Sequence, residues 1–398
     1  MRQEPLRQEA RPETRQEPRQ ETSTLDSGQE PAASSRSCRT DLDLSAPTTI
    51  CRATAMSTFL RPNPPFGLKT GDIIRGNTRV KSATEKFSAL LYLKSVNNLP
   101  LDQIMRRGNF EDMTPVFPDE RLRLERPGGS MAMRIVDLVS PIGKGQRGMI
   151  VSPPKAGKTT LLKDAAKSIL RNNPEMYLII LLIDERPEEV TDIKEAIQGS
   201  NVEVIYSTFD EQPEHHKRVS EMVIERAKRL VESKKDVTIF IDSITRLARA
   251  YNLTVPPSGR TLSGGSSGST LHAETVLRRG QKHARGRKPD DLATALVDTG
   301  SKMDDVVYEE FKGTGNMELV LDRKLQERRV FPAIDIAKSG TRREDLLLTP
   351  DEQEAVYNMR KALNGMKSEE AVENILNMFA RTRNNGELIQ ILKKQKIV

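Results

Sequence analysis

The segment Ser152–Thr160, which reads SPPKAGKTT, constrains the fold of this chain more than any other feature. It follows an apolar run at Gly148–Ser152, and helical spacing begins at Lys158 and continues to Arg171. A glycine- and lysine-bearing loop between a buried strand and a helix is typical of phosphate-binding P-loops. Its one departure from the G-x-x-x-x-G-K-[ST] pattern is Ser152, which stands where the first glycine is expected.

Each residue type in this loop has a chemical reason to be there. Gly157 lets backbone N–H groups approach a phosphate, and Lys158 would reach the β- and γ-phosphates of a nucleotide. The hydroxyl of Thr159 is a ligand for Mg²⁺. The loop therefore predicts ATP and Mg²⁺ as cofactors, against the alternative of a lysine-bearing turn that binds no ligand.

Two apolar runs end in acidic residues. Met176–Asp184 and Val237–Asp242 read as buried strands, and Glu185 follows the first of them. Because ligands bind at the carboxyl ends of parallel strands, these side chains are expected beside the P-loop. Asp242 is predicted to hold Mg²⁺ and Glu185 to polarise the attacking water. For either residue alone, a helix cap or a surface ion pair is the competing interpretation.

Residues 130–350 alternate strands with helices, which predicts an α/β domain with a parallel central sheet. A long amphipathic helix is expected at Arg218–Glu232, and Thr349–Leu392 is expected to be helical with breaks near 364–365 and 384–386. Short strands are predicted at Leu296–Val297 and Val330–Ile334. Several basic residues follow the predicted strands, among them Arg246 and Arg249, and a glycine-flanked arginine such as Arg342 or Arg343 is a candidate for an arginine finger.

Composition excludes several classes of protein. The 63 basic residues exceed the 56 acidic ones, for a net charge of +7, which permits a nucleic-acid partner. No apolar run approaches the roughly 18 residues that a membrane helix needs, and no export signal opens the chain, so a cytoplasmic protein without membrane contact is expected. Two cysteines, Cys38 and Cys51, rule out a disulfide scaffold or a cysteine-built zinc site.

The domain boundaries follow from composition. Residues 1–65 are polar, repetitive and poor in apolar residues, and are predicted to be disordered. Residues 66–101 contain two or three strands of a small β-barrel, residues 102–129 form a charged linker, and residues 130–398 form the α/β domain.

The chain resembles the Rho family of hexameric RNA helicases across Phe66–Gly265 and Ala293–Val398. The stretches that carry the resemblance are PIGKGQRG at 141–148, PPKAGKT at 153–159, DERPEEV at 184–190, DSITRLARAYN at 242–252, DTGSKMD at 298–304, YEEFKGTGNMEL at 308–319 and RVFPAID at 329–335. This resemblance implies a RecA-like P-loop ATPase motor preceded by a partial OB-fold. It implies a homohexamer that binds single-stranded RNA and acts as an RNA-dependent ATPase and helicase on the RNA polymerase transcription complex.

The resemblance also implies roles for individual residues. Glu185 and Lys158 would be catalytic, and Arg342 would be the finger given to the neighbouring subunit, with Arg329 a weaker second. The nucleotide would be lined by Gly143, Lys144, Gly145, Gln146, Arg147, Gly148, Lys155, Ala156, Gly157, Lys158, Thr159, Thr160, Arg186 and Phe331. RNA would be bound by Glu85, Lys86 and Phe87 on the OB-fold, and by Arg260 and Lys302 in a central channel.

Two segments depart from this family. The first half of the OB-fold is missing before Phe66, and residues 266–292 are basic and poor in apolar residues. When compatible codons for residues 271–292 are read from the second base, they give a peptide similar to the expected family segment. We hypothesise that residues 1–65 and 266–292 are translated out of frame, which the nucleotide sequence of these codons tests directly. The segment 266–292 would then be an exposed loop, and the central sheet would lack one strand.

Three functions remain open at this point. The first is a Rho-like, ATP-dependent RNA translocase that terminates transcription. The second is a RecA-like ATPase of another class, such as a rotary ATP synthase catalytic subunit. The third is a decayed or mis-sequenced chain that is inactive as written.

Overall fold

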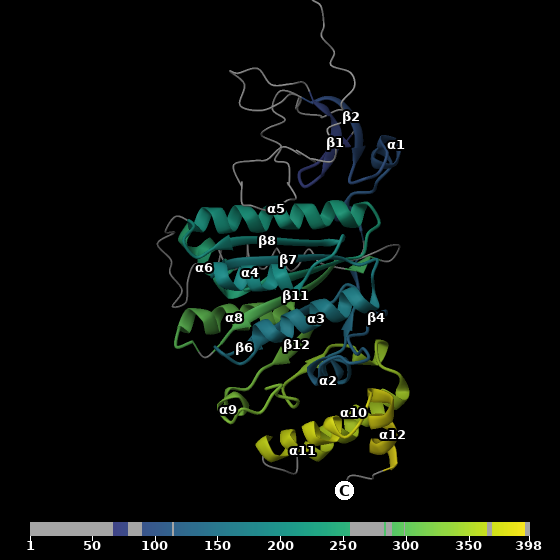
Figure 1. Cartoon of the computed structure of the whole chain (residues 1–398), viewed down its shortest axis with the longest axis vertical. Helices are drawn as coiled ribbons and strands as arrows, with labels where there is room; N and C mark the ends of the chain where they lie inside the picture. Colours follow the sequence, from purple (N-terminus) through teal and green to yellow (C-terminus); the bar gives the residue numbers. More distant parts are fainter. Residues whose placement is uncertain are drawn as a thin grey trace, which may run out of the picture. The chain divides into compact units, whose positions relative to one another are not determined.

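A seven-stranded sheet organises the chain (Figure 1). The computed structural model describes residues 67–78, 90–113, 115–254, 282–283, 289–297, 299–363 and 368–394. The strand order is β13-β12-β6-β11-β9-β7-β8, and all neighbours pair in parallel except β13, which is antiparallel to β12. The strands are β6 (Arg147–Ser152), β7 (Tyr177–Glu185), β8 (Val202–Thr208), β9 (Val237–Asp242), β11 (Pro289–Leu296), β12 (Met317–Val320) and β13 (Gly340–Thr341). The predicted α/β fold with a parallel central sheet is confirmed.

Both faces of this sheet are covered by helices, and β7 shows why its sequence is continuously apolar. Leu178, Ile180 and Leu182 pack into the core that contains residues of α3 (Lys158–Asn172) and α4 (Pro187–Ala196). Ile179, Leu181 and Ile183 pack into the other core, with α5 (Pro213–Glu232), α6 (Ile244–Thr254) and α8 (Lys302–Thr314). Because side chains alternate between the faces of a strand, a strand covered on both sides has no solvent-facing position.

The C-terminal helices pack against α2 (Met131–Val139). They are α10 (Pro350–Leu363), α11 (Ser368–Ala380) and α12 (Asn385–Lys394), so the predicted helical region and its second break are confirmed. The first break, at 364–365, lies outside the described residues. The buried guanidinium of Arg134 on α2 donates to the carbonyl oxygens of Phe379 and Thr382 at 2.8 and 2.7 Å, which satisfies carbonyl groups at the end of α11.

Three further strand pairs and four short helices complete the described chain. The hairpin β1 (Ile74–Thr78) with β2 (Leu90–Val96) packs on α1 (Leu101–Met105) through a core of its own. Two further pairs are β3 (Pro115–Val116) with β10 (Lys282–His283), and β4 (Arg121–Leu122) with β5 (Ile142–Gly143). The remaining short helices are η2 (Phe110–Asp112), α9 (Arg323–Glu327) and η3 (Glu344–Leu346).

The central strand β11 corrects one prediction. The sheet does not lack this strand, because Pro289–Leu296 lies between β6 and β9 and pairs with both. Only its second half, from Ala293, continues the family resemblance. Apart from Pro289, which has no N–H and lies at the first position of the strand, these residues carry the usual backbone donors and acceptors, so the chain preceding Ala293 extends the ladder although its composition differs from a buried strand. The rest of the segment 266–292, apart from β10, lies outside the described residues, as does the segment 1–65.

The predicted strand at Val330–Ile334 is also wrong. Within it, only Ile334 makes a bridge, to Leu321, and Pro332 has no N–H to donate to a ladder. The sheet uses β12 and β13 instead.

The helix α5 begins five residues before the predicted start. Pro213 occupies its first position, where a missing N–H costs nothing.

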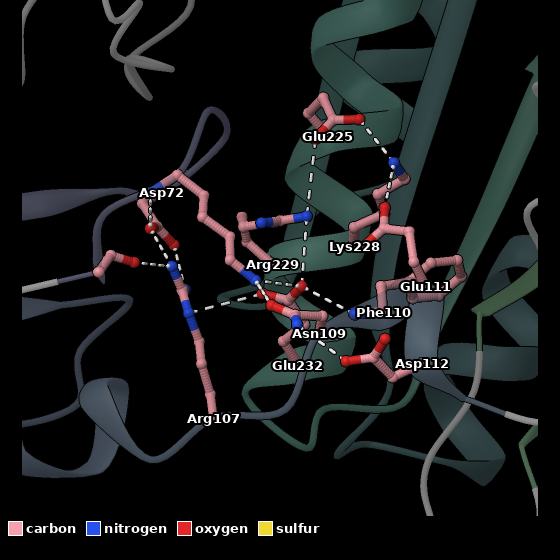
Figure 2. Close-up of polar contacts among 12 residues, drawn as sticks. Asp72, Arg107, Asn109, Phe110, Glu111, Asp112, Glu225, Lys228, Arg229 and Glu232 are labelled. Carbon is pink, nitrogen blue, oxygen red and sulfur yellow. Dashed lines mark hydrogen bonds and ion pairs between the residues drawn. The ribbon is translucent and has the colours of Figure 1, made fainter. Parts of the chain in front are cut away.

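A buried cluster of charges attaches the hairpin segment to α5 (Figure 2). Arg107 donates to both carboxylate oxygens of Asp72 at 2.6 Å, and its Nε lies 3.5 Å from Glu232 Oε2 at the end of α5. Glu232 also accepts from the backbone N–H of Phe110 at 3.0 Å and lies 3.3 Å from Arg229. The side chains of Arg107, Asp72 and Glu232 are 4%, 3% and 0% exposed. Arg107 therefore joins two buried anions from different parts of the chain.

Replacing Arg107 by alanine should destabilise the protein strongly. Both Asp72 and Glu232 would lose a cation while they stay buried, and breaking a buried ion pair costs about 3–5 kcal/mol. Urea denaturation followed by circular dichroism measures the effect. Arg106→Ala, at an exposed neighbouring position, is the control and should cost under about 0.5 kcal/mol. Equal stabilities of the two variants would contradict the role given to Arg107.

Candidate active site

The predicted P-loop is present at the carboxyl end of β6. The strand ends at Ser152, and α3 begins at Lys158. Lys155 and Gly157 both have left-handed backbones, with φ of 66° and 91°. Gly157 occupies the N-cap of α3 and provides no side-chain cap, so the first N–H groups of the helix are left for another acceptor. This arrangement is the one in which a helix N-terminus binds phosphate.

Lys158 brings together the two carboxylates that end β7 and β9. Its ammonium group is hydrogen bonded to Asp242 Oδ1 and lies 3.5 Å from Glu185 Oε1. These strands are neighbours in the sheet, with Leu182 paired to Asp242, so their ends meet. Asp242 and Glu185 are 1% and 2% exposed. The expected cluster of one lysine and two carboxylates beside the loop therefore exists.

Glu185 lies in an environment that opposes its ionisation. Burial raises the pKa of this carboxyl, and the nearby negative charge of Asp242 raises it further. Lys158 and Arg246 act in the opposite direction, and Arg246 lies 3.2 Å from Glu185 Oε2. A carboxylate with a raised pKa is a suitable proton acceptor for water.

The donor set fits a magnesium ion. Thr159, in the first turn of α3, is partly buried and carries a hydroxyl, and Asp242 carries a carboxylate. Mg²⁺ prefers oxygen ligands and is commonly bound by one or two protein side chains together with phosphates. Within the part of the chain that the structure describes, no group of three or more His, Cys, Asp or Glu residues forms a metal site without a nucleotide.

Four other predicted residues are exposed. Arg186 is the N-cap of α4, and Phe331 is 49% exposed after α9. Arg342 directly follows the edge strand β13, and its backbone N–H, at 2.8 Å from Asn316 O, fixes the chain there. Arg329 has a left-handed backbone with φ of 61°. All four side chains are therefore accessible to groups outside this chain.

Residues Gly143–Gly148 are not brought to the P-loop within one chain. They precede or begin β6, whereas the loop follows its carboxyl end, about 16 Å away at ~3.3 Å per residue. Lys144 pairs with Asp236, immediately before β9 begins, at 3.2 Å. Gln146 donates to Asn316 at 2.6 Å, and the neighbouring Arg147 donates to the carbonyl oxygen of Thr314. These groups therefore lie at or before the amino end of β6, away from the P-loop at its carboxyl end, and their assignment to the nucleotide stays a prediction.

Both basic residues after β9, Arg246 and Arg249, are engaged within the chain. Arg246 contacts the carbonyl oxygen of Asp184 as well as Glu185, and Arg249 donates to the buried Asp304 at 2.9 and 2.7 Å. Lys302, predicted to contact RNA, is exposed at the first position of α8. The other predicted RNA contacts, Glu85, Lys86, Phe87 and Arg260, lie outside the described residues.

One residue of the cluster was missed by the sequence analysis. Thr294 on β11 is fully buried and donates to Asp242 Oδ1 at 2.8 Å. The available signal was a hydroxyl within the apolar stretch LATAL. A lone threonine in a strand is so common that only the strand order shows its neighbour.

Comparison with known proteins gives two matching family models. Residues 132–341 match the ATP synthase alpha/beta family, nucleotide-binding domain, and residues 64–102 match the Rho termination factor, RNA-binding domain. The chain is 52% identical to transcription termination factor Rho of Aquifex aeolicus, over 82% of this chain and 76% of that protein. It is 50% identical to the factor of Bacillus subtilis, over 83% of this chain and 76% of that protein.

Solved structures share the fold. The assembled ATPase EscN, from the type III secretion system of enteropathogenic E. coli, superposes with a TM-score of 0.60 at 20% identity, covering 79% of both chains. A prototypical type III secretion ATPase of pathogenic bacteria superposes with a TM-score of 0.58 at 21% identity, covering 71% of this chain and 87% of the other. Among the described residues, no helix is long and apolar enough to cross a membrane.

The contact between Arg246 and Glu185 predicts a pH effect on ATP hydrolysis. Glu185 must be ionised to accept a proton, so activity falls as pH drops through its raised pKa. Arg246→Gln removes a cation that lowers this pKa, so the acid limb of the pH–rate profile should move to higher pH. Arg249→Gln, whose partner is Asp304, should leave the limb in place. A limb that does not move in Arg246→Gln would contradict the assignment of the titrating group to Glu185.

Proposed function

The chain belongs to the family of transcription termination factor Rho, and on this premise we propose that it is an RNA-dependent ATPase and helicase that translocates along nascent RNA. Its membership supports the coarser statement of an RNA-binding termination factor with an ATP-hydrolysing domain. The observation that carries the proposal is the cluster of Lys158 with Glu185 and Asp242 at the end of the P-loop. RNA binding is supported by the match of residues 64–102.

Lys158 has two successive partners in this proposal. Without nucleotide, its ammonium group compensates the buried charges of Asp242 and Glu185. When ATP enters, Lys158 contacts the β- and γ-phosphates instead, and the N–H groups at the start of α3 orient the phosphates. Lys155, Ala156, Gly157 and Thr160 line the same loop, Arg186 contacts the phosphate side, and Phe331 packs on the adenine.

Glu185 then accepts a proton from the attacking water. Its pKa, raised by burial, brings its basicity closer to what the transfer requires, and Arg246 keeps the carboxylate oriented. Thr159 and Asp242 would hold Mg²⁺, which supplies charge neutralisation at the phosphates when it is bound. The chemistry assigned to this chain is therefore the positioning of phosphate and the activation of water.

ATP hydrolysis is coupled to RNA binding through the arrangement of the subunits in the hexamer. We assign residues 66–101 to the OB-fold that binds single-stranded RNA, residues 102–129 to the linker and residues 130–398 to the motor. In a homohexamer, Lys302 and Arg260 would face RNA, and Arg342 would complete the site of the neighbouring subunit. The expected partner is the RNA polymerase transcription complex in the cytoplasm.

Two variants test the chemistry. Lys158→Ala should abolish ATP hydrolysis, because no other group replaces its contact with the β- and γ-phosphates. Glu185→Gln should bind a fluorescent ATP analogue normally and lose hydrolysis by about 10²–10⁴-fold, since only water activation is removed. Hydrolysis is measured with and without single-stranded RNA. Stimulation by RNA supports the Rho-like function, whereas RNA-independent hydrolysis would favour a rotary-type ATPase. Normal turnover by Glu185→Gln would refute its role.

Mixing two inactive variants tests the role of Arg342. A finger that acts on the neighbouring subunit leaves its own P-loop intact. Mixed hexamers of Arg342→Ala and Lys158→Ala subunits should therefore contain some interfaces with both functional residues, and should regain part of the ATPase activity. Arg343→Ala, which removes the adjacent exposed arginine, is the matched control for surface charge. Mixtures that stay as inactive as each parent would show that Arg342 does not act in trans.

A further inference from the structure

Thr294 occupies the strand that separates the P-loop strand from the Asp242 strand. It lies on β11, paired with Ile150 of β6, and the preceding Ala293 is paired with Ile241 of β9. Its side chain is 0% exposed. No part of the phosphate loop contains this residue, yet the strand order brings it against the carboxylate that ends β9.

The hydroxyl of Thr294 has one dominant acceptor. It lies 2.8 Å from Asp242 Oδ1 and 3.4 Å from the carbonyl oxygen of Ile241. A hydroxyl donates a single proton, and the shorter contact to an ionised acceptor is the stronger one. Thr294 therefore donates to Asp242, on the same oxygen that Lys158 contacts.

Lys158 and Thr294 differ in whether they can keep their contact with Asp242 when ATP binds. Lys158 belongs to the P-loop and leaves Asp242 when it turns to the phosphates of ATP. Thr294 belongs to a buried strand that is paired on both sides, so its position is fixed by the sheet and not by the P-loop. From these contacts we propose that Thr294 is a positioning residue that fixes the Asp242 carboxylate for the Mg²⁺–nucleotide complex. This proposal rests on the proposed function, and it deepens the part assigned to Asp242.

A series of substitutions at position 294 isolates the hydroxyl. Thr294→Ser keeps the hydroxyl, Thr294→Cys keeps a weak donor, and Thr294→Val keeps the shape without a donor. Thr238→Val is the matched control, because Thr238 is also buried, at 1% exposed, but lies near the start of β9. All four are made in the full chain.

The test measures binding of ATP that carries a fluorescent N-methylanthraniloyl group, during titration with MgCl₂ and separately in EDTA. Thr294→Val should need about tenfold more Mg²⁺ for half-maximal binding, the factor expected when one hydrogen bond to a charged group is lost. Binding in EDTA should be unchanged. The Mg²⁺ requirement should increase in the order Ser, Cys, Val, and Thr238→Val should resemble the unchanged protein.

The outcomes separate this inference from the proposed function. If the unchanged protein binds the analogue without any Mg²⁺ dependence, the assignment of Asp242 fails and this inference fails with it. If the unchanged protein responds to Mg²⁺ and Thr294→Val responds equally, only the inference about Thr294 is overturned. An equal shift in Thr238→Val would reveal a general effect of core packing and would also overturn it. If Thr294→Val does not fold, the comparison of Cys with Ser decides between the same results.

Discussion

The structure depends on a constraint of charge: two carboxylates are buried side by side at the ends of β7 and β9. Isolated buried anions are costly, and a second like charge nearby raises the cost further. The raised pKa of Glu185 reflects both effects. Lys158 is the cation that compensates the two buried negative charges, and it is also the residue that a phosphate would contact. In the chain without nucleotide, the site therefore holds its own counter-ion, and phosphate binding must be coupled to a redistribution of charge around Glu185 and Asp242.

Strand order is what converts a sequence motif into this site. Neighbouring strands lie ~4.8 Å apart, so β6 and β9 are separated by about 10 Å with β11 between them. The P-loop and Asp242 consequently approach from two sides of β11, and Thr294 lies beneath the gap. The unusual composition that precedes Ala293 has not displaced this strand, because the chain pairs with β9 from Pro289 and with β6 from Asp291. A central strand is thus stabilised by backbone pairing with the strands beside it, whereas a loop of the same composition lacks that pairing.

Sequence predicted the parts of this site that are encoded locally. The loop before Lys158 and the carboxylates after two apolar runs follow from patterns within a few residues, and the structure places them together. The sequence could not show which arginines are already engaged, because Arg249 and its partner Asp304 are far apart in the chain. The assignment of Gly143–Gly148 to the nucleotide came from the family resemblance, and the local pattern alone does not show that the length of β6 separates them from the P-loop. The failed strand at Val330–Ile334 has a local cause, because apolar composition was weighed above the missing N–H of Pro332.

The amino ends and the carboxyl ends of the parallel strands serve different purposes, and β9 runs from the one side to the other. At its start, the chain turns from Glu232, which holds Arg107 and the backbone of Phe110, into a strand whose six residues are all buried. At its end lies Asp242, beside Lys158 and Thr294. The segment that matches the RNA-binding family model therefore contacts the end of α5, and the phosphate site is built at the end of the strand that follows α5. Packed strands resist deformation more than loops do, since shifting one disturbs close-packed neighbours on both faces. Because β9 is buried along its whole length and paired on both sides, Asp242 is held at the end of a strand that its neighbours keep in place.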